Sequence, residues 1–104
     1  MAIEWIAIIY DKPGSDRTPY RPQHLKDIPP NVENGKIVSA GAIYKDVIDG
    51  KPTNFAGSML NLVADTKEEA LDIIRNDVFA KNGVWDVENV LIYPFGCAVR
   101  KEKK

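Results

Sequence analysis

An almost unbroken apolar run near the N-terminus, Glu4-Trp5-Ile6-Ala7-Ile8-Ile9-Tyr10, constrains the fold of this chain more than any other feature. Its short length, its β-branched and aromatic residues and the Asp11-Lys12-Pro13-Gly14 turn signal that follows predict a β-strand. Because the run does not alternate between apolar and polar residues, we expect both of its faces to be covered. Any fold for this chain must therefore place a packing layer on each side of this strand.

Turn signals divide the rest of the chain into three more strands. Lys36–Ile43 and about Phe55–Ala64 are typical of strands, and the Asp49-Gly50 pair between them predicts a hairpin turn. Gly41 weakens its strand and suggests a bulge or a close backbone approach. A fourth strand is expected at about Val87–Tyr93, ended by a proline.

Two helices are expected between these strands. Pro22 suits the first turn of a helix that runs to about Ile28, where Pro29-Pro30 should interrupt it before a short second piece at Asn31–Asn34. Thr66-Lys67-Glu68-Glu69 is a capping box, and it opens a helix with one apolar stripe.

The predicted order is therefore strand, helix, strand, strand, helix, strand. Two βαβ halves joined by a central hairpin give a ferredoxin-like α+β fold, a four-stranded antiparallel sheet with both helices on one face. The helices then leave the other face of the apolar first strand uncovered, and a monomer seldom exposes a large apolar face. We therefore expect a homodimer, in which a second copy covers that face.

Size and composition fit one soluble globular domain. The chain has 104 residues, of which 44% are hydrophobic and 28% charged, so we expect one domain over residues 1–99 and a basic tail at 100–104. The net charge of −1 argues against nucleic-acid binding. No apolar run is long enough to cross a membrane and no signal-peptide pattern is present, so we expect a cytoplasmic protein. The single cysteine, Cys97, excludes an intrachain disulfide.

His24 is the only histidine and the first candidate for a proton-transfer site. Histidine is the one side chain whose charge ordinarily changes between pH 5 and 8, and a position near a helix start favours the neutral imidazole, which can act as a base. Ser58 shares one side of the third strand with Leu60 and Leu62, where it either faces a pocket or bonds to a neighbour. Asp77, at a helix end, is on its own most simply a cap or a solvated carboxylate.

Several short motifs, taken in order, resemble the YciI-like (YCII-related) family. They are Arg21-Pro22-x-His24-Leu25, Glu33-Asn34-Gly35-Lys36-Ile37-x-x-Ala40-Gly41, Gly57-Ser58, Glu69-Ala70, and Asn76-Asp77-Val78-Phe79 ahead of Gly83-Val84. The resemblance runs from about Ile6 to Phe95. It implies a dimeric α+β barrel with a pocket that holds His24 and Asp77 as an acid–base pair. Related barrels isomerise, eliminate from or oxidise small cyclic compounds, and some only bind them. Val78 replaces the motif's proline, so the pocket mouth is expected to differ.

Two functions of different classes follow. The first is a lyase or isomerase without a cofactor or metal, in which His24 removes a proton from a small ring compound while Asp77 fixes the imidazole tautomer. Arg21 would bind an anionic substrate group and Ser58 would line the pocket, whereas Arg17 is interpreted as part of a surface salt bridge. The second is a non-catalytic module that binds a small molecule or a partner protein, with His24 merely hydrogen-bonded.

Overall fold

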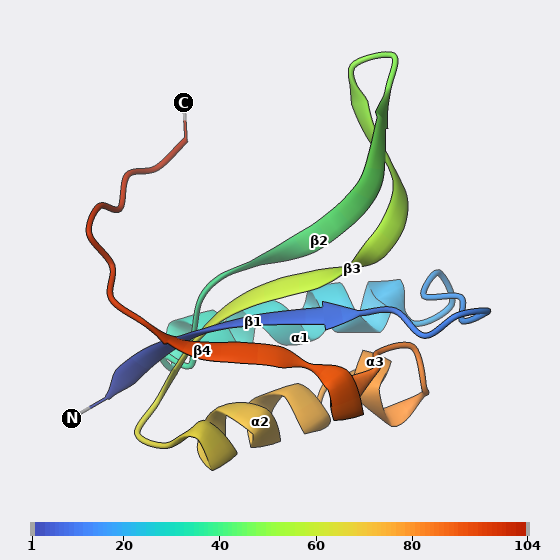
Figure 1. Cartoon of the computed structure of the whole chain (residues 1–104). Helices are drawn as coiled ribbons and strands as arrows, with labels where there is room; N and C mark the ends of the chain where they lie inside the picture. The colour runs from blue at the N-terminus through green and yellow to red at the C-terminus, as the bar shows by residue number, and fades with distance from the viewer. Residues whose placement is uncertain (1, 104) are drawn as a thin grey trace.

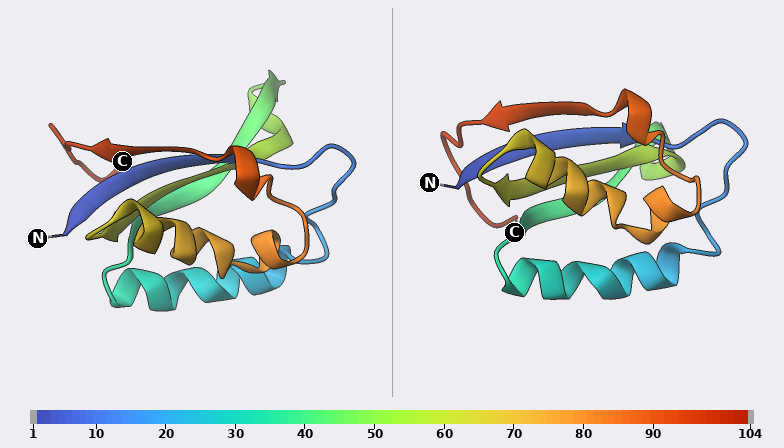
Figure 2. Two further views of the ribbon diagram at one scale, coloured as in Figure 1. Left: turned by 60° about the horizontal axis from the view of Figure 1, so that its bottom comes forward. Right: turned by 90° about the horizontal axis from the view of Figure 1, so that it is seen from below.

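A four-stranded sheet with helices packed against one face makes up the computed structural model, which describes residues 2–103 (Figures 1 and 2). The elements in chain order are β1 (Ile3–Tyr10), α1 (Arg21–Glu33), β2 (Ile37–Ile48), β3 (Lys51–Ala64), α2 (Lys67–Arg75), α3 (Val78–Lys81), the 3₁₀ helix η1 (Val87–Asn89) and β4 (Leu91–Phe95). No helix of the described chain is long and apolar enough to cross a membrane.

The sheet has the order β2-β3-β1-β4, and every neighbouring pair of strands is antiparallel. The two central strands, β3 and β1, come from opposite halves of the chain, and Ala7 of β1 lies opposite both Leu60 of β3 and Ile92 of β4. The α+β class, the four antiparallel strands and the ferredoxin-like order predicted from the sequence are confirmed.

The core lies between the sheet and the helices. Along β1, Trp5, Ala7 and Ile9 are buried against the helices, whereas the residues between them point to the other face and are half-buried. Alternation in β3 places Leu60 and Leu62 on the same helix-facing side, as the period of a strand requires. The first strand is therefore covered on one face by this chain's own helices, and its other face belongs to the open side of the sheet.

Helix α1 differs from the expectation of a broken helix, because it continues through Pro29 and Pro30 without interruption. Both prolines are exposed, so the carbonyl groups that lose a hydrogen-bond donor one turn earlier lie on the outer side of the helix. The side-chain amide of Asn31 adds a hydrogen bond to the Asp27 carbonyl oxygen in the same part of the helix.

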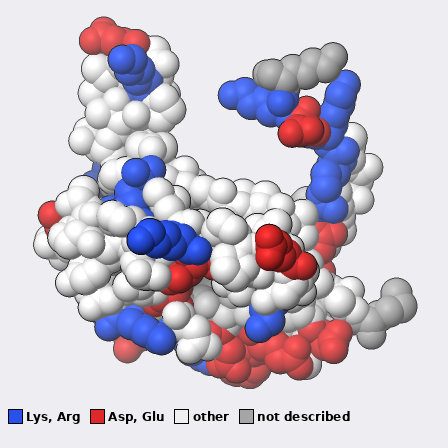
Figure 3. All heavy atoms as spheres, turned by 180° about the vertical axis from the view of Figure 1, so that it is seen from behind, with Lys and Arg blue, Asp and Glu red and all other residues white. Residues whose placement is uncertain are grey.

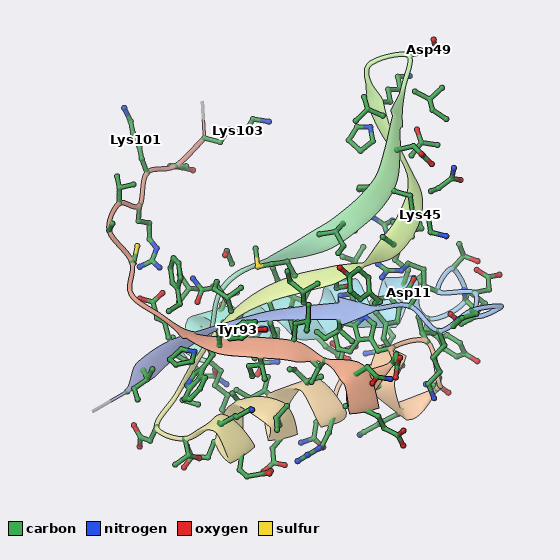
Figure 4. All side chains as sticks on the ribbon, viewed as in Figure 1. Asp11, Lys45, Asp49, Tyr93, Lys101 and Lys103 are labelled. Atoms are coloured by element: carbon green, nitrogen blue, oxygen red, sulfur yellow. The ribbon has the colours of Figure 1, made fainter. Side chains whose placement is uncertain are left out.

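The central hairpin and the last strand also depart from their expected bounds. Strands β2 and β3 extend to the tip of the hairpin, where Asp49 and Gly50 both adopt positive φ (51° and 75°), as a two-residue type I′ turn requires. The hairpin rises well beyond the rest of the sheet (Figure 1), with Asp49 at its tip (Figure 4). Residues Val87–Asn89 form η1, and β4 starts only at Leu91. Pro94 lies inside β4, which an edge strand tolerates.

The close backbone approach suspected at Gly41 occurs at Gly57 instead. A Cβ atom built on Gly57 would lie 2.1 Å from the carbonyl oxygen of Ile9, whereas one on Gly41 meets nothing within 4 Å. Gly57 therefore lets β3 and β1 run close together at the end of the sheet that carries Asp11.

The residues after β4 turn back toward the open face of the sheet. Arg100 forms an ion pair with Glu4 of β1, and its hydrogen bond holds the pKa of that carboxyl below its usual range. The hairpin and this C-terminal segment rise on the same side of the sheet (Figure 1). The surface between them is largely free of charged side chains (Figure 3).

Candidate active site

The imidazole of His24 and the carboxylate of Asp77 are in direct contact. His24 lies in the first turn of α1 and is 7% exposed, and its Nδ1 lies 2.8 Å from Asp77 Oδ2 and 2.9 Å from Oδ1. Asp77 comes from the other half of the chain, at the junction of α2 and α3. There it also caps α3 by accepting a 2.9 Å hydrogen bond from the N–H of Phe79. The cap and the histidine contact are thus roles of one carboxylate.

This contact assigns distinct roles to the two imidazole nitrogens. A carboxylate only accepts hydrogen bonds, so Nδ1 carries the proton and donates, and Nε2 of the neutral ring has a free lone pair. Among the described residues Nε2 has no hydrogen-bond partner. The free nitrogen is therefore available to accept a proton from a ligand.

Two aromatic rings hold the imidazole in place. Phe79 stacks on His24 with a centroid distance of 4.1 Å and an interplanar angle of 16°, and Trp85 meets the same ring edge-on at 5.6 Å. Both side chains are almost fully buried. Phe79 contacts both members of the pair, because its backbone N–H binds Asp77 while its ring packs on His24. The orientation of the pair is therefore fixed by the packed core and not by a loop.

Arg17 lies in the core, contrary to its interpretation as part of a surface salt bridge. Its side chain is 4% exposed, and its Nε and Nη2 bind the two carboxylate oxygens of Asp11 at 3.0 and 2.7 Å. The guanidinium carbon lies 4.6 Å from the ring centroid of Phe55 and 4.8 Å from that of Phe79. Asp11 directly follows β1 (Figure 4), so the ion pair ties the loop before α1 to the sheet.

Ser58 is buried and bonded to its neighbours, the plainer of the two possibilities for it. Its hydroxyl oxygen accepts hydrogen bonds from Arg17 Nη2 at 3.1 Å and from Trp85 Nε1 at 3.2 Å, and its side chain is among those most completely buried. The serine thus joins Arg17 to Trp85, which packs against the histidine ring, and it lines none of the cavities found.

Arg21, the first residue of α1, is exposed and lies near the same aromatic ring as Arg17. Its guanidinium carbon is 5.8 Å from the ring centroid of Phe55, and it forms no salt bridge with any described residue. Phe55 in turn stacks on Tyr44 of the neighbouring strand at 5.1 Å. Arg21 is therefore free to bind an anion beside the aromatic pair.

A cavity of about 310 Å³ lies between α1 and α2 and touches one member of the pair. Asp77 lines it, whereas His24 does not, and its floor includes Leu60 of β3. A separate hollow of about 390 Å³ is lined by Thr18, Arg21, Pro22 and Leu25. Within residues 2–103, no group of three or more His, Cys, Asp or Glu side chains could hold a metal ion.

Sequence reasoning missed Arg17, Asp11 and the aromatic rings as parts of this site. The loop that carries Arg17 is rich in proline, glycine and charged residues, which is typical of exposed segments. The signal that was available is an acid and a base, Asp11 and Arg17, within one loop, which indicates an ion pair but not that the pair is buried.

Comparison with known proteins places the chain in a family. The model of the YCII-related domain matches residues 3–95. Fusaric acid biosynthesis protein 2 of Gibberella fujikuroi is 30% identical over 95 residues, which cover 88% of this chain and 91% of that protein. Aspartate kinase FUB3 of Fusarium oxysporum is 29% identical over 97% of this chain, but the chain spans only 19% of that protein's length.

A solved structure shares the fold. It is 5-chloro-2-hydroxyhydroquinone dehydrochlorinase from Burkholderia phenoliruptrix in complex with 2,5-dihydroxybenzoquinone, and the two structures superpose with a TM-score of 0.75 at 22% sequence identity. The likeness covers 90% of this chain and 94% of the enzyme. With a family model that matches from the first strand to the last, this chain belongs to the family of YCII-related domains.

Proposed function

We propose that this protein is a cofactor-independent lyase or isomerase that acts on a small cyclic compound by acid–base catalysis at His24 and Asp77. The observation that carries the proposal is the 2.8 Å contact between His24 Nδ1 and Asp77, which leaves Nε2 unpaired. A base oriented by a carboxylate in this way has the arrangement that serves proton transfer in catalytic triads. Well-placed general base catalysis contributes about 10²–10⁴-fold to a rate.

The chemistry begins with transfer of a proton from an acidic C–H or O–H of the ring to Nε2 of neutral His24. The electron pair left behind forms a new π bond. In an elimination this electron pair displaces a leaving group from the neighbouring carbon as an anion, and the imidazolium then gives its proton to solvent. In an isomerisation the imidazolium returns its proton to a different carbon of the same ring. Asp77 stabilises the imidazolium between the two steps through the hydrogen bond to Nδ1.

The comparisons support small-molecule chemistry for this site. One relative is named for the biosynthesis of fusaric acid, and the enzyme that shares the fold is a dehydrochlorinase of a chlorinated hydroxyhydroquinone. Loss of hydrogen chloride from such a ring is an elimination, which needs a base such as an imidazole in the protein and a leaving group on the substrate. For this chain we therefore favour substrates that carry an acidic hydrogen next to a leaving group or a carbonyl.

We further propose that the protein works as a homodimer whose subunits meet through the open face of the sheet. On that face Tyr93 is 61% exposed, Leu91 42% and Phe95 40%, and Ile6 and Ile8 are half-buried. An exposed apolar sheet face, here flanked by the β2–β3 hairpin and the C-terminal segment, is unusual on a monomer. A second copy of the chain would cover this face and so bury the side of β1 that the helices do not cover.

Turnover of a substrate panel tests the catalytic proposal. We expect the wild-type protein to convert at least one of a set of small lactones, quinols and halogenated ring acids, followed by ultraviolet absorbance and chloride release. The His24→Gln variant should lose this activity, because glutamine cannot accept the proton. Lys26→Gln, which changes an exposed residue of the same helix, serves as the matched control and should retain it.

A binding module would give a different result. Saturable binding of panel compounds without any turnover, unchanged in His24→Gln, would support that second function and overturn the proposed one. Turnover that persists in His24→Gln would show that another group supplies the base.

A further inference from the structure

The guanidinium of Arg17 has donors left over in a nearly closed environment. Arginine carries five N–H groups, and Nε and Nη2 of Arg17 use theirs on Asp11 and Ser58. No described residue accepts from Nη1. A side chain that is 4% exposed thus keeps two charged donors without a partner among the described residues.

A second guanidinium lies beside the same aromatic ring. Arg17 and Arg21 lie 4.6 and 5.8 Å from the ring centroid of Phe55, and Asp11 balances the charge of Arg17 alone. Only Arg17 has a carboxylate partner, so the charge of Arg21 is uncompensated among the described residues and would attract an anion placed beside the ring. No side chain caps the first turn of α1, and the positive end of this 13-residue helix adds to the same field.

The surroundings favour a flat ring as the carrier of that anion. Phe55 and Tyr44 form a stacked aromatic pair next to the two guanidinium groups. Aromatic side chains pack well against planar ligands, and guanidinium grips a carboxylate or phenolate with directed hydrogen bonds. The ring of Phe79 touches both Arg17 at 4.8 Å and His24 at 4.1 Å, so this region adjoins the imidazole.

From these contacts we infer that Arg17 and Arg21 form an anion-binding site beside Phe55, and that the substrate is a small planar ring with a carboxylate or phenolate group. This inference names the substrate class of the site in the proposed function and therefore rests on it. Arg17 is the fixed half of the site, held by Asp11 and Ser58, and Arg21 is the adaptable half on the surface. The site would hold the anionic group while His24 faces the reacting part of the ring.

Calorimetric titration with benzoate, and with benzamide as the neutral analogue of the same shape, tests the inference on the full-length protein. We expect benzoate to bind at least about tenfold more tightly than benzamide, since one charge-assisted hydrogen bond raises an affinity by about tenfold or more. Arg21→Gln should weaken benzoate by about tenfold or more and leave benzamide unchanged. Lys26→Gln, the matched loss of an exposed charge on the same helix, should leave both unchanged.

Arg17→Lys extends the test to the buried arginine of the site, since lysine keeps the positive charge but lacks the paired N–H donors of a guanidinium. If that variant folds, its benzoate affinity should also fall; if it does not fold, the Arg21→Gln comparison still decides. Equal affinity for the two probes, no benzoate binding, or an unchanged benzoate affinity in Arg21→Gln would each overturn the anion site. Turnover of neutral lactones without preference for ring acids would overturn it too while leaving the His24 chemistry in place. Selective benzoate binding with no turnover of any panel compound would support the anion site and would contradict the proposed catalysis by His24.

Discussion

At the scale of single residues, Asp77 does two things with one carboxylate. It holds Nδ1 of His24 and caps α3 through the Phe79 N–H. A substitution that separates the two roles can therefore distinguish a structural aspartate from one that serves the chemistry.

Asparagine at position 77 makes this separation. Asn is as good an N-cap as Asp, so Asp77→Asn should leave the unfolding midpoint nearly unchanged. Its amide can present an N–H to Nδ1 and so favour the wrong imidazole tautomer, and we expect turnover to fall by about 10²–10⁴-fold. Asp77→Ala should lose the activity and also about 1 kcal/mol of stability, because the cap is gone. A fully active Asp77→Asn protein would show that the carboxylate is only a cap.

Of the site residues, the two that contact each other and Ser58 could be predicted, whereas the burial of Arg17 could not. His24 stands out because it is the only histidine, and Asp77 follows from the resemblance of its surrounding motif. Ser58 shares one side of its strand with Leu60 and Leu62, which is a local signal for burial. Arg17 has no such signal, because it is buried through a tertiary contact with Ser58, 41 residues away in the chain.

At the scale of elements, the close contact between β1 and β3 at Gly57 sets how the sheet can form. Gly57→Ala would place a methyl group against the Ile9 carbonyl oxygen, and the two strands would have to move apart. We expect a loss of about 1–3 kcal/mol or more, as for other overpacked positions. Gly41→Ala is the control, because the space there is open and alanine restricts the unfolded chain, so its stability should stay equal or rise by up to about 1 kcal/mol. Urea denaturation of both variants measures the difference, and equal midpoints would contradict the close approach.

The start of α2 offers a second test at this scale. Thr66 Oγ1 accepts from the Glu69 N–H at 3.2 Å, while the Glu69 carboxylate accepts from the Asp65 N–H at 3.4 Å, one residue before the position that the capping box predicts. Thr66→Ala should reduce the free energy of unfolding by about 1 kcal/mol. Lys67→Ala, which removes no cap, should change it little. An unaltered midpoint for Thr66→Ala would mean that this cap carries no stability.

Element types were predictable where local signals agree, and element bounds were not. The Asp49-Gly50 turn and the Thr66 cap act within a few residues, so the sequence shows them directly. The continuity of α1 through Pro29 and Pro30 depends instead on which side of the helix faces outward. The late start of β4 at Leu91 reflects the formation of η1 by the residues before it. Both are settled by packing against distant parts of the chain.

At the scale of the whole molecule, the proposed dimer makes a prediction about the open sheet face. Tyr93→Glu would place a charge on that face, where Tyr93 is 61% exposed on the edge strand β4 (Figure 4). Burial of an unpaired charge at an interface is costly, so we expect this variant to be a folded monomer while the wild type is a dimer by light scattering. Val32→Glu puts the same charge on α1, on the opposite side of the sheet, and should remain dimeric. A wild-type monomer at micromolar concentration would contradict the assembly.

We infer that Asp77 fixes the proton of His24 on Nδ1, which leaves Nε2 as the base of the proposed reaction. Because the chain has one histidine, ¹⁵N NMR of the labelled protein reports that single imidazole without overlap. At a pH where the ring is neutral, we predict a protonated Nδ1 and an unprotonated Nε2, with the proton redistributed toward Nε2 in Asp77→Asn. A proton found on Nε2 in the wild-type protein would contradict the claim, because the nitrogen that faces the ligand could not then accept one.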